Sequence, residues 1–497
     1  FGLYPLYAGH MPGFLWSNGF GLGETIRAHV MGAESIVGVP MQVVANLIIG
    51  FVVFGIALTI TGGGEFFMNF ATALMGRSRG GPAKVAVVSS AFMGSLSGSA
   101  VSNILTTGTI TIPAMKRSGY SREYAAAVEA CASTGGTLMP PVMGAVAFIM
   151  ASFLGVSYGE VMMAALLPAL LFYLALLLQV DNYAARKGLT GMPAKDIPRV
   201  RETLLSGWPY LLSLSVLIYM LLVMRLESQA PYYATLMLLV ISLVRRQQRL
   251  RISQVLDFFY QLAHGVGSLV AVLAGIGLVV GGLSYTGVAG AFSRELLLYA
   301  GDSIPLMLAA GAITSFILGM GMTVSACYIF LSILLAPALV GAGLNPLASH
   351  LFILYWGMLS YITPPVALAA ITAAGVAGAN STLTSLHAVR LGAVLFVLPF
   401  LFVLNPSLIL QGPLLSVIAS AFTAMTAIWL VAAAMEGYLY RIGSVGVRMR
   451  CALLIPAALM IYPEWISDLL GFLALALCYL IAVMRTTKCA DITKCST

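Results

Sequence analysis

Charged residues are scarce in this sequence. Lysine, arginine, aspartate and glutamate make up only 8% of the 497 residues, whereas hydrophobic residues make up 60% and the mean hydropathy is +0.98. Such a composition excludes a soluble globular domain. The net charge of +8 lies largely in short loops, where basic residues indicate membrane topology, and no basic stripe suits nucleic acid. We therefore expect an all-α polytopic membrane protein.

Cysteine and histidine are also sparse. The six cysteines and five histidines show neither a disulfide framework nor the spacing of zinc ligands. The sequence contains no nucleophile elbow, phosphate loop or dinucleotide fingerprint, so we expect no catalytic residues, no organic cofactor and no metal beyond a coupling ion. The chain is predicted not to be an enzyme.

Acidic residues are rare in the apolar core, and Glu129 is the notable one. A carboxylate at membrane depth is costly and often functional. Three roles are open for it: it carries protons, it contributes to a cation site, or it only pairs with a loop arginine. We take Glu129 as a candidate coupling residue.

Small and hydroxyl residues interrupt the apolar sequence at 89–103. Basic clusters flank this run at 77–84 and 116–122, and the positive-inside bias places both in the cytoplasm. Residues 85–115 are too many for one span and too few for two. We predict a re-entrant hairpin with residues 94–98 near its tip. The alternative, one long tilted helix with a kink, would put one basic cluster on the wrong side.

A discontinuous helix is predicted directly after the hairpin. The helix begins near Tyr124, and Gly135-Gly136 and Pro140-Pro141 must interrupt it, because proline lacks the N–H that continues a helix. The second part is expected from Val142 to Leu154. Broken backbone at membrane depth is tolerated only inside protein or beside a watery cavity, so the break indicates a binding site.

The same features recur 224 residues later. Pro113 and Pro140 are 27 residues apart, as are Pro337 and Pro364, and a second glycine-rich break occupies 315–325. The flanks of this second break carry no basic residue, so its hairpin should open to the opposite face. Two inverted repeats, each with a re-entrant hairpin and a discontinuous helix, are typical of secondary transporters with a site at the repeat interface.

These observations predict five regions. They are residues 1–38 as an N-terminal surface segment, 39–185 as the first repeat with its hairpin at 85–115, 186–251 as connecting spans and basic loops, 252–406 as the second repeat with its hairpin at 306–340, and 407–497 as extra C-terminal spans with a cytoplasmic tail.

Each break offers hydroxyls and free carbonyls, which suit a hard cation such as Na⁺. We therefore predict one ion site in each repeat. The candidate ligands are Ser97, Gly98, Ser99, Asn103, Gly136 and Thr137 in the first repeat, and Gly319, Gly321, Thr323, Ser360 and Thr363 in the second. The alternative is that these small residues only permit close helix packing. Abundant hydroxyls and scarce carboxylates favour Na⁺ over H⁺ as the coupling ion.

Several motifs resemble the large permease subunit of TRAP transporters, and among these the fused permeases of the TAXI-type subfamily. The motifs are SGSAVSN at 97–103, EACASTGG at 129–136, MPPVMG at 139–144 and ITPPVALAA at 362–370. The likeness covers about 39–406. The hairpin-tip and broken-helix residues match the positions where the family places its ion and substrate sites. The resemblance thus implies substrate contacts at Ser99, Asn103, Pro140, Thr323 and Pro364.

The resemblance also implies a function. It implies a multi-pass protein of the prokaryotic inner membrane that imports organic acids, usually with Na⁺, by an elevator mechanism. Substrate would come from an extracytoplasmic binding protein. Fused members carry a small four-helix subunit ahead of the large one, so this subunit is expected either upstream in the same polypeptide or as a separate protein.

Other functions stay open at this point. A stand-alone carrier of dicarboxylates could use similar hairpins without a binding protein. A channel would show downhill, uncoupled flux, and an intramembrane enzyme would need a catalytic dyad, of which the sequence shows no sign. Substrate identity does not follow from the sequence.

Overall fold

The computed structural model describes residues 2–245, 251–301, 303–462 and 464–494, and this part of the chain is almost entirely helical. Seven of the described helices are long and apolar enough to cross a membrane, and several shorter apolar helices accompany them. The expectation of an all-α polytopic membrane protein is confirmed. Within the described ranges the strands are limited to the short antiparallel pair β1 (Tyr438–Leu439) and β2 (Gly443–Ser444).

The N-terminal region and the first repeat contain mostly short helices. Their bounds are α1 (Tyr4–Tyr7), η1 (Ala8–His10), η2 (Gly13–Leu15), α2 (Leu22–Met31), α3 (Val39–Val43), the π-helical turn η3 (Val44–Ile48), α4 (Ile49–Ile60), α5 (Gly63–Met75), α6 (Gly81–Ser97), α7 (Ala100–Asn103), the π-helical turn η4 (Ile104–Gly108), α8 (Thr109–Arg117), α9 (Arg122–Gly136), α10 (Ala145–Leu154) and α11 (Tyr158–Lys187). The connecting region contributes η5 (Ala194–Asp196), α12 (Val200–Leu222) and α13 (Ala230–Val244).

The second repeat follows a similar order of helices, and a C-terminal group comes after it. The second-repeat bounds are α14 (Ile252–Tyr285), α15 (Val288–Ala300), α16 (Ile304–Gly319), α17 (Val324–Leu334), α18 (Ala336–Gly341), α19 (Pro346–Leu359), α20 (Leu368–Ala377), α21 (Ser381–Leu391), α22 (Ala393–Leu404) and η7 (Pro406–Ile409). The C-terminal helices are α23 (Leu414–Glu436), α24 (Val447–Leu459) and α25 (Trp465–Lys494).

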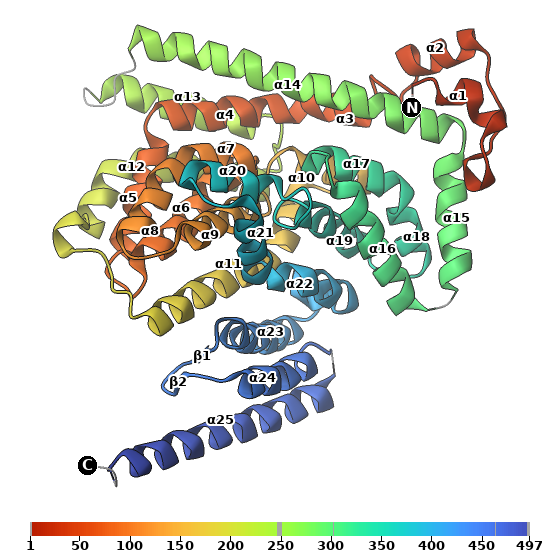
Figure 1. The fold of residues 1–497 in the computed structure, drawn as a ribbon. Coiled ribbons are helices and arrows are strands. Elements are labelled where there is room, and N and C mark those ends of the chain that lie inside the picture. The colour runs from red at the N-terminus through yellow and green to blue at the C-terminus, as the bar shows by residue number, and fades with distance from the viewer. Residues whose placement is uncertain (1, 246–250, 302, 463, 495–497) are drawn as a thin grey trace.

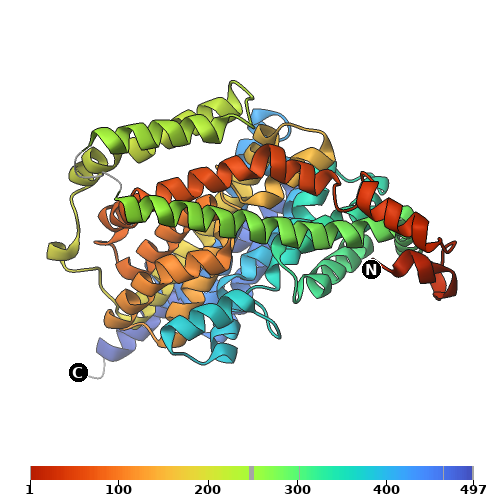
Figure 2. The same ribbon diagram turned by 90° about the horizontal axis from the view of Figure 1, so that it is seen from above.

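Long helices enclose the short ones. In Figure 1, α4 and α14 run along the top of the molecule and α25 runs along the bottom, with the broken and hairpin helices between them. Figure 2 shows α14 lying across the helices beneath it. The central helices α9 and α19 are almost completely buried. In α9, small residues such as Ala125, Ala126 and Ala127 allow neighbouring backbones to approach closely.

The chain doubles back within residues 85–115. Helix α6 packs against α7, η4 and α8, which follow it, so the segment is a hairpin and not one long helix. The bend lies at Gly98 and Ser99, because α6 continues to Ser97. The predicted tip at residues 94–98 thus contains the bend at its last residue, whereas Gly94 is a buried residue one turn earlier inside α6.

The two hairpins have their open ends at opposite ends of the molecule. In Figure 1, α5, α8 and the connection that leads to α12 lie at the left, whereas α15 and α18 lie at the right. Helices α16 and α17 pack against each other around the second bend, between Gly319 and Val324. The direction in which each hairpin enters a bilayer stays a prediction from the charge pattern.

Each repeat also contains a broken helix. The first consists of α9 and α10, and the second of α19 and α20. The Pro140–Pro141 and Pro364–Pro365 bonds in the two breaks are both cis. Helix α10 begins at Ala145, three residues after the expected Val142, because Met143 and Gly144 both have positive φ angles.

Candidate ion and substrate site

The two hairpin bends share one local design. Gly98 has a φ of 61° and Gly321 a φ of 87°, a region of backbone space that glycine reaches without strain. A hydroxyl then caps the second arm of each hairpin: Ser102 N donates to Ser99 Oγ over 3.3 Å, and Ala326 N donates to Thr323 Oγ1 over 3.2 Å. Both caps belong to the predicted ion ligands, and each hydroxyl oxygen keeps a second lone pair for a cation.

Close backbone contacts join the first hairpin to the first broken helix. A Cβ on Gly94 would lie 2.7 Å from Gly136 Cα, and a Cβ on Gly98 would lie 2.3 Å from Gly144 Cα. Asn103 joins this contact, because its Nδ2 donates to Ser90 O over 2.9 Å. The structure therefore brings Gly98, Asn103 and Gly136 to one interface.

Not all first-repeat candidates take part in this interface. The side chains of Ser97 and Ser99 are exposed at the bend. Thr137 is buried at the end of α9, where its hydroxyl donates to Thr134 O over 2.9 Å. Ser97 and Ser99 thus lie at the exposed bend and Thr137 at the end of α9, outside the contact that joins Gly98, Asn103 and Gly136.

The second repeat brings its candidates together in a similar way. Ser360 Oγ lies 2.8 Å from Gly319 O and 3.0 Å from Gly357 O, so it joins the hairpin to the broken helix α19. Gly321 and Thr323 are exposed at the bend. Thr363 Oγ1 is buried and has no hydrogen-bond partner among the described residues, which leaves its lone pairs open to a ligand.

Each repeat contributes one helix that packs against the hairpin of the other repeat. Helix α20 of the second repeat packs against α7, η4 and α8 of the first hairpin, whereas α10 of the first repeat packs against α17 of the second hairpin. Lys116 Nζ donates to Ala377 O over 2.9 Å, and Thr137 Oγ1 lies 4.0 Å from Met358 Sδ. The breaks that contain Pro140 and Pro364 therefore belong to one intertwined unit.

Glu129 lies behind the first hairpin and is fully buried. Four hydroxyl groups donate to its carboxylate. They belong to Ser90 at 2.7 Å, Thr107 at 2.6 Å, Thr111 at 2.6 Å and Ser133 at 3.2 Å. No arginine or lysine pairs with Glu129 in the described part of the chain, so the simple pairing with a loop arginine is wrong.

These four hydroxyl residues were not among the predicted site residues. Thr107 and Thr111 are four residues apart in the sequence and face one side of a helix, so their spacing was a usable signal. Ser315 was also missed: its buried Oγ has no hydrogen-bond partner in the described ranges, and it lies one helical turn before Gly319. Buried hydroxyls therefore extend behind both hairpins.

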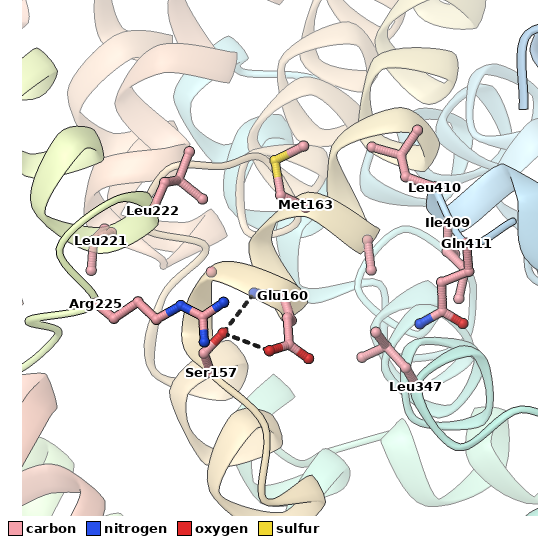
Figure 3. Close-up of a pocket in the computed structure, with 12 residues that line it drawn as sticks. Ser157, Glu160, Met163, Leu221, Leu222, Arg225, Leu347, Ile409, Leu410 and Gln411 are labelled. Atoms are coloured by element: carbon pink, nitrogen blue, oxygen red, sulfur yellow. Dashed lines mark hydrogen bonds between the residues drawn. The ribbon is translucent and has the colours of Figure 1, made fainter. Parts of the chain in front are cut away.

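A separate cavity of about 290 Å³ lies away from the predicted site residues, none of which lines it. Its walls come from the start of α11, the end of α12 and the turn before α23. Figure 3 shows Glu160 in the middle of the cavity, with Arg225 and Gln411 on opposite sides. Ser157 Oγ donates to Glu160 Oε1 over 3.0 Å. We assign no role to this cavity.

Comparisons with known proteins agree with this architecture. Residues 10–417 match the family described as the tripartite ATP-independent periplasmic transporter, DctM component. The chain is 24% identical over 379 residues to an isethionate TRAP transporter permease protein of Oleidesulfovibrio alaskensis, covering 72% of this chain and 58% of that protein.

Shorter matches join the chain to other permeases of this kind. It is 33% identical over 171 residues to a C4-dicarboxylate TRAP transporter large permease protein of Pseudomonas aeruginosa, covering 34% of this chain and 39% of the relative. It is 27% identical over 143 residues to a sialic acid TRAP transporter permease protein of Haemophilus influenzae, covering 29% and 23%. The matches thus span 58% or less of each relative.

The family match covers most of the chain, and the helices fit a multi-pass protein of the inner membrane. The TAXI-type assignment is not confirmed by these comparisons and stays a prediction. A permease family is a family of transporters and not of enzymes, as the sequence predicted. The chain therefore belongs to the DctM family, the large permease component of tripartite ATP-independent periplasmic (TRAP) transporters.

Proposed function

We propose that this chain is the permease subunit of a secondary transporter that imports organic acids by an elevator mechanism driven by an ion gradient. The observation that carries this proposal is the exchange of helices between the repeats: α20 packs on the first hairpin and α10 on the second. In the proposed mechanism, the two hairpins and two broken helices, which pack as one unit, carry the site between them past a static part of the protein. The names of the relatives, which include a C4-dicarboxylate and a sialic acid permease, support the substrate class.

We propose Na⁺ as the coupling ion, with one site behind each bend. The supporting features are the carbonyl and amide groups around Gly98, Asn103 and Gly136, and the hydroxyls of Ser360 and Thr363. Oxygen ligands of this kind suit a hard cation. The exposed bend residues Ser97, Ser99, Gly321 and Thr323 complete the ion ligands on the open side of each site.

The substrate carboxylate is proposed to lie between the two bends. Ser99 and Thr323 sit at the N-termini of the second hairpin arms, where free N–H groups favour an anion. Asn103, Pro140 and Pro364 lie next to the same breaks. A negative substrate beside two Na⁺ ions also reduces the charge that must cross the membrane.

Proton coupling through Glu129 is the second candidate. Its buried carboxylate has hydroxyl partners but no cationic partner among the described residues, so a proton would neutralise it. Ser90 and Thr107 contact both Glu129 and Asn103, which would connect its charge to the first ion site. If transport is coupled to protons through Glu129, the Glu129→Gln variant should lose uptake driven by a pH gradient.

The proposed partners are an extracytoplasmic substrate-binding protein and a small four-helix membrane subunit. The test is uptake of radiolabelled organic acids into proteoliposomes that contain the permease with its small subunit. The binding protein and an inward Na⁺ gradient are each supplied or omitted. We expect uptake to require both.

Three other outcomes would contradict the proposal. Uptake without the binding protein would indicate a stand-alone dicarboxylate carrier. Uptake driven by a pH gradient alone would replace Na⁺ by H⁺ and make Glu129 the central residue. Downhill flux with no coupling to either ion would indicate a channel.

A further inference from the structure

The C-terminal helices form a module that begins at Leu414, at the end of the matched family region, which extends to residue 417. Helices α23, α24 and α25 pack on one another around their own apolar cluster, which includes Leu430, Leu439 and Leu453. In Figure 1 these helices lie below the repeats, with α23 nearest to them. Helix α23 packs along α11, so the module contacts the rest of the molecule over a long surface.

A buried carboxylate lies where this module meets the repeats. Glu436, the last residue of α23, is fully buried. Arg390 Nη2 lies 3.1 Å from its Oε1, Arg186 Nη2 lies 3.5 Å from its Oε2, and Tyr124 donates a hydrogen bond of 3.4 Å. One carboxylate thus joins α23 to α21, α11 and α9.

Backbone contacts strengthen the same junction. Arg186 Nη1 donates to Glu436 O over 2.7 Å, and Arg450 of α24 donates to Met435 O over 2.8 Å. Removing one partner from a buried ion pair leaves an uncompensated charge and is strongly unfavourable. The junction should therefore persist while other parts of the protein move.

The helices joined at Glu436 are those that carry the candidate site. Helix α21 packs against α9, which precedes the first break, and α20, which follows the second. The Arg390 guanidinium lies 5.8 Å from the centre of the Tyr124 ring, and Tyr124 is on α9. A displacement of Glu436 would consequently reach α9 directly through Tyr124, and α20 through the packing of α21.

The module also contacts the base of the first hairpin. Tyr438 in β1 lies beneath the Arg79 guanidinium, 5.5 Å from ring centre to Cζ. Arg79 pairs with Asp181 of α11, and Lys84 of α6 pairs with the same carboxylate at 2.7 Å. The C-terminal module therefore contacts the hairpin and the broken helices independently.

We propose that Glu436 is a positioning residue that holds the C-terminal module and the broken helices together as one moving unit. This inference rests on the proposed transport function. The module then travels with the site during transport, and Glu436 controls the rate of that movement without contacting the ion or the substrate. Loss of the pair lets α21 shift against α23, so the site moves less efficiently while its own ligands stay in place.

The experiment measures Na⁺-dependent uptake by the full chain with its partner proteins in proteoliposomes. The variants are Glu436→Gln, Arg390→Gln and the double variant, and Glu464→Gln is the matched control because Glu464 is an exposed carboxylate of the same module. Folded protein in each sample is measured by size-exclusion chromatography and thermal unfolding. We expect each single variant to lower the maximal rate about fivefold or more, with unchanged half-saturating concentrations of substrate and Na⁺.

Residues that act as a unit are non-additive, so the double variant should be no slower than the slower single variant. Arg390→Lys, which keeps the positive charge, should recover part of the rate. Wild-type rates in Arg390→Gln or Glu436→Gln would overturn the inference, as would uptake that falls only in step with the amount of folded protein. Failure of the wild-type chain to transport would instead overturn the proposed function.

Discussion

Thr363 has a buried hydroxyl without a hydrogen-bond partner among the described residues, next to the second break. An unpaired buried hydroxyl is unfavourable, so a bound ion would satisfy it. We predict that Thr363→Ala raises the half-saturating Na⁺ concentration about fivefold, equivalent to about 1 kcal/mol, and that Ser99→Ala acts in the same direction. Na⁺-dependent uptake measures this effect.

Thr372→Ala is the matched control for the ion-site prediction. Thr372 is a threonine of α20 whose hydroxyl donates to Leu368 O, one turn earlier in its own helix. Its removal should leave the Na⁺ dependence unchanged. If Thr363→Ala and Ser99→Ala behave like this control, the assignment of these two ion ligands is wrong.

The Glu129 carboxylate accepts hydrogen bonds from four hydroxyl groups. Glu129→Ala would remove the carboxylate that accepts hydrogen bonds from Ser90, Thr107 and Thr111. We predict a loss of about 3 kcal/mol in the free energy of unfolding, because a hydrogen bond to a charged group contributes about 1.5–3 kcal/mol and the remaining partners of these hydroxyls offset part of the loss. Thermal unfolding in detergent measures the loss. Glu123→Ala in the same helix is the control, and equal unfolding temperatures of the two variants would contradict the prediction.

At the scale of elements, the contact between the first hairpin and the first broken helix depends on glycine. A Cβ at Gly98 would combine a φ of 61° with an approach of 2.3 Å to Gly144 Cα, whereas Gly155 has a φ of 66° and no atom within 4 Å of its Cβ position. Both alanine variants carry the same backbone strain, of about 1–2 kcal/mol, but only Gly98→Ala adds a clash.

We therefore predict that Gly98→Ala destabilises the protein by about 2 kcal/mol more than Gly155→Ala and also lowers uptake. The difference in unfolding temperature between the two variants measures the destabilisation caused by the clash with Gly144. A Gly98→Ala variant as stable and active as Gly155→Ala would show that the hairpin tolerates separation from the broken helix.

The breaks show which helix boundaries could be predicted from the sequence. The double prolines predicted a broken helix in each half, because proline removes a backbone donor wherever it stands, whereas the hairpins were predicted from the runs of small residues and their flanking charges. The predicted tip at residues 94–98 includes the bend at Gly98 but begins one turn too early, since the run of small residues around Gly94 continues the helix when it can pack against Gly136. Packing between segments decided the end of the helix.

At the scale of the whole molecule, the charge pattern predicts opposite membrane orientations for the two hairpins. We predict that a cysteine at Arg117, at the open end of the first hairpin, reacts with a membrane-impermeant maleimide only after cells are broken. A cysteine at Ser303, at the open end of the second, should react in intact cells. Both positions are exposed, and the native cysteines are first replaced. Labelling of both positions from the same side would contradict the inverted repeats.

The sequence by itself determined the membrane class and the positions of the breaks. These properties depend on local composition: apolar length sets the spans, and proline interrupts helices irrespective of what surrounds them. The sequence motifs also identified the family, because they lie in short contiguous stretches such as 97–103 and 362–370.

Only the tertiary structure decided which distant residues meet. Glu129 is surrounded by hydroxyls from α6, η4, α8 and its own helix, and Glu436 pairs with arginines 46 and 250 residues away in the sequence. Such contacts depend on how helices pack, and many packings suit the same apolar pattern. The physical reason is that a hydrophobic span specifies a place in the membrane but not a neighbour, whereas a buried polar group is stable only beside the partners that the complete fold provides.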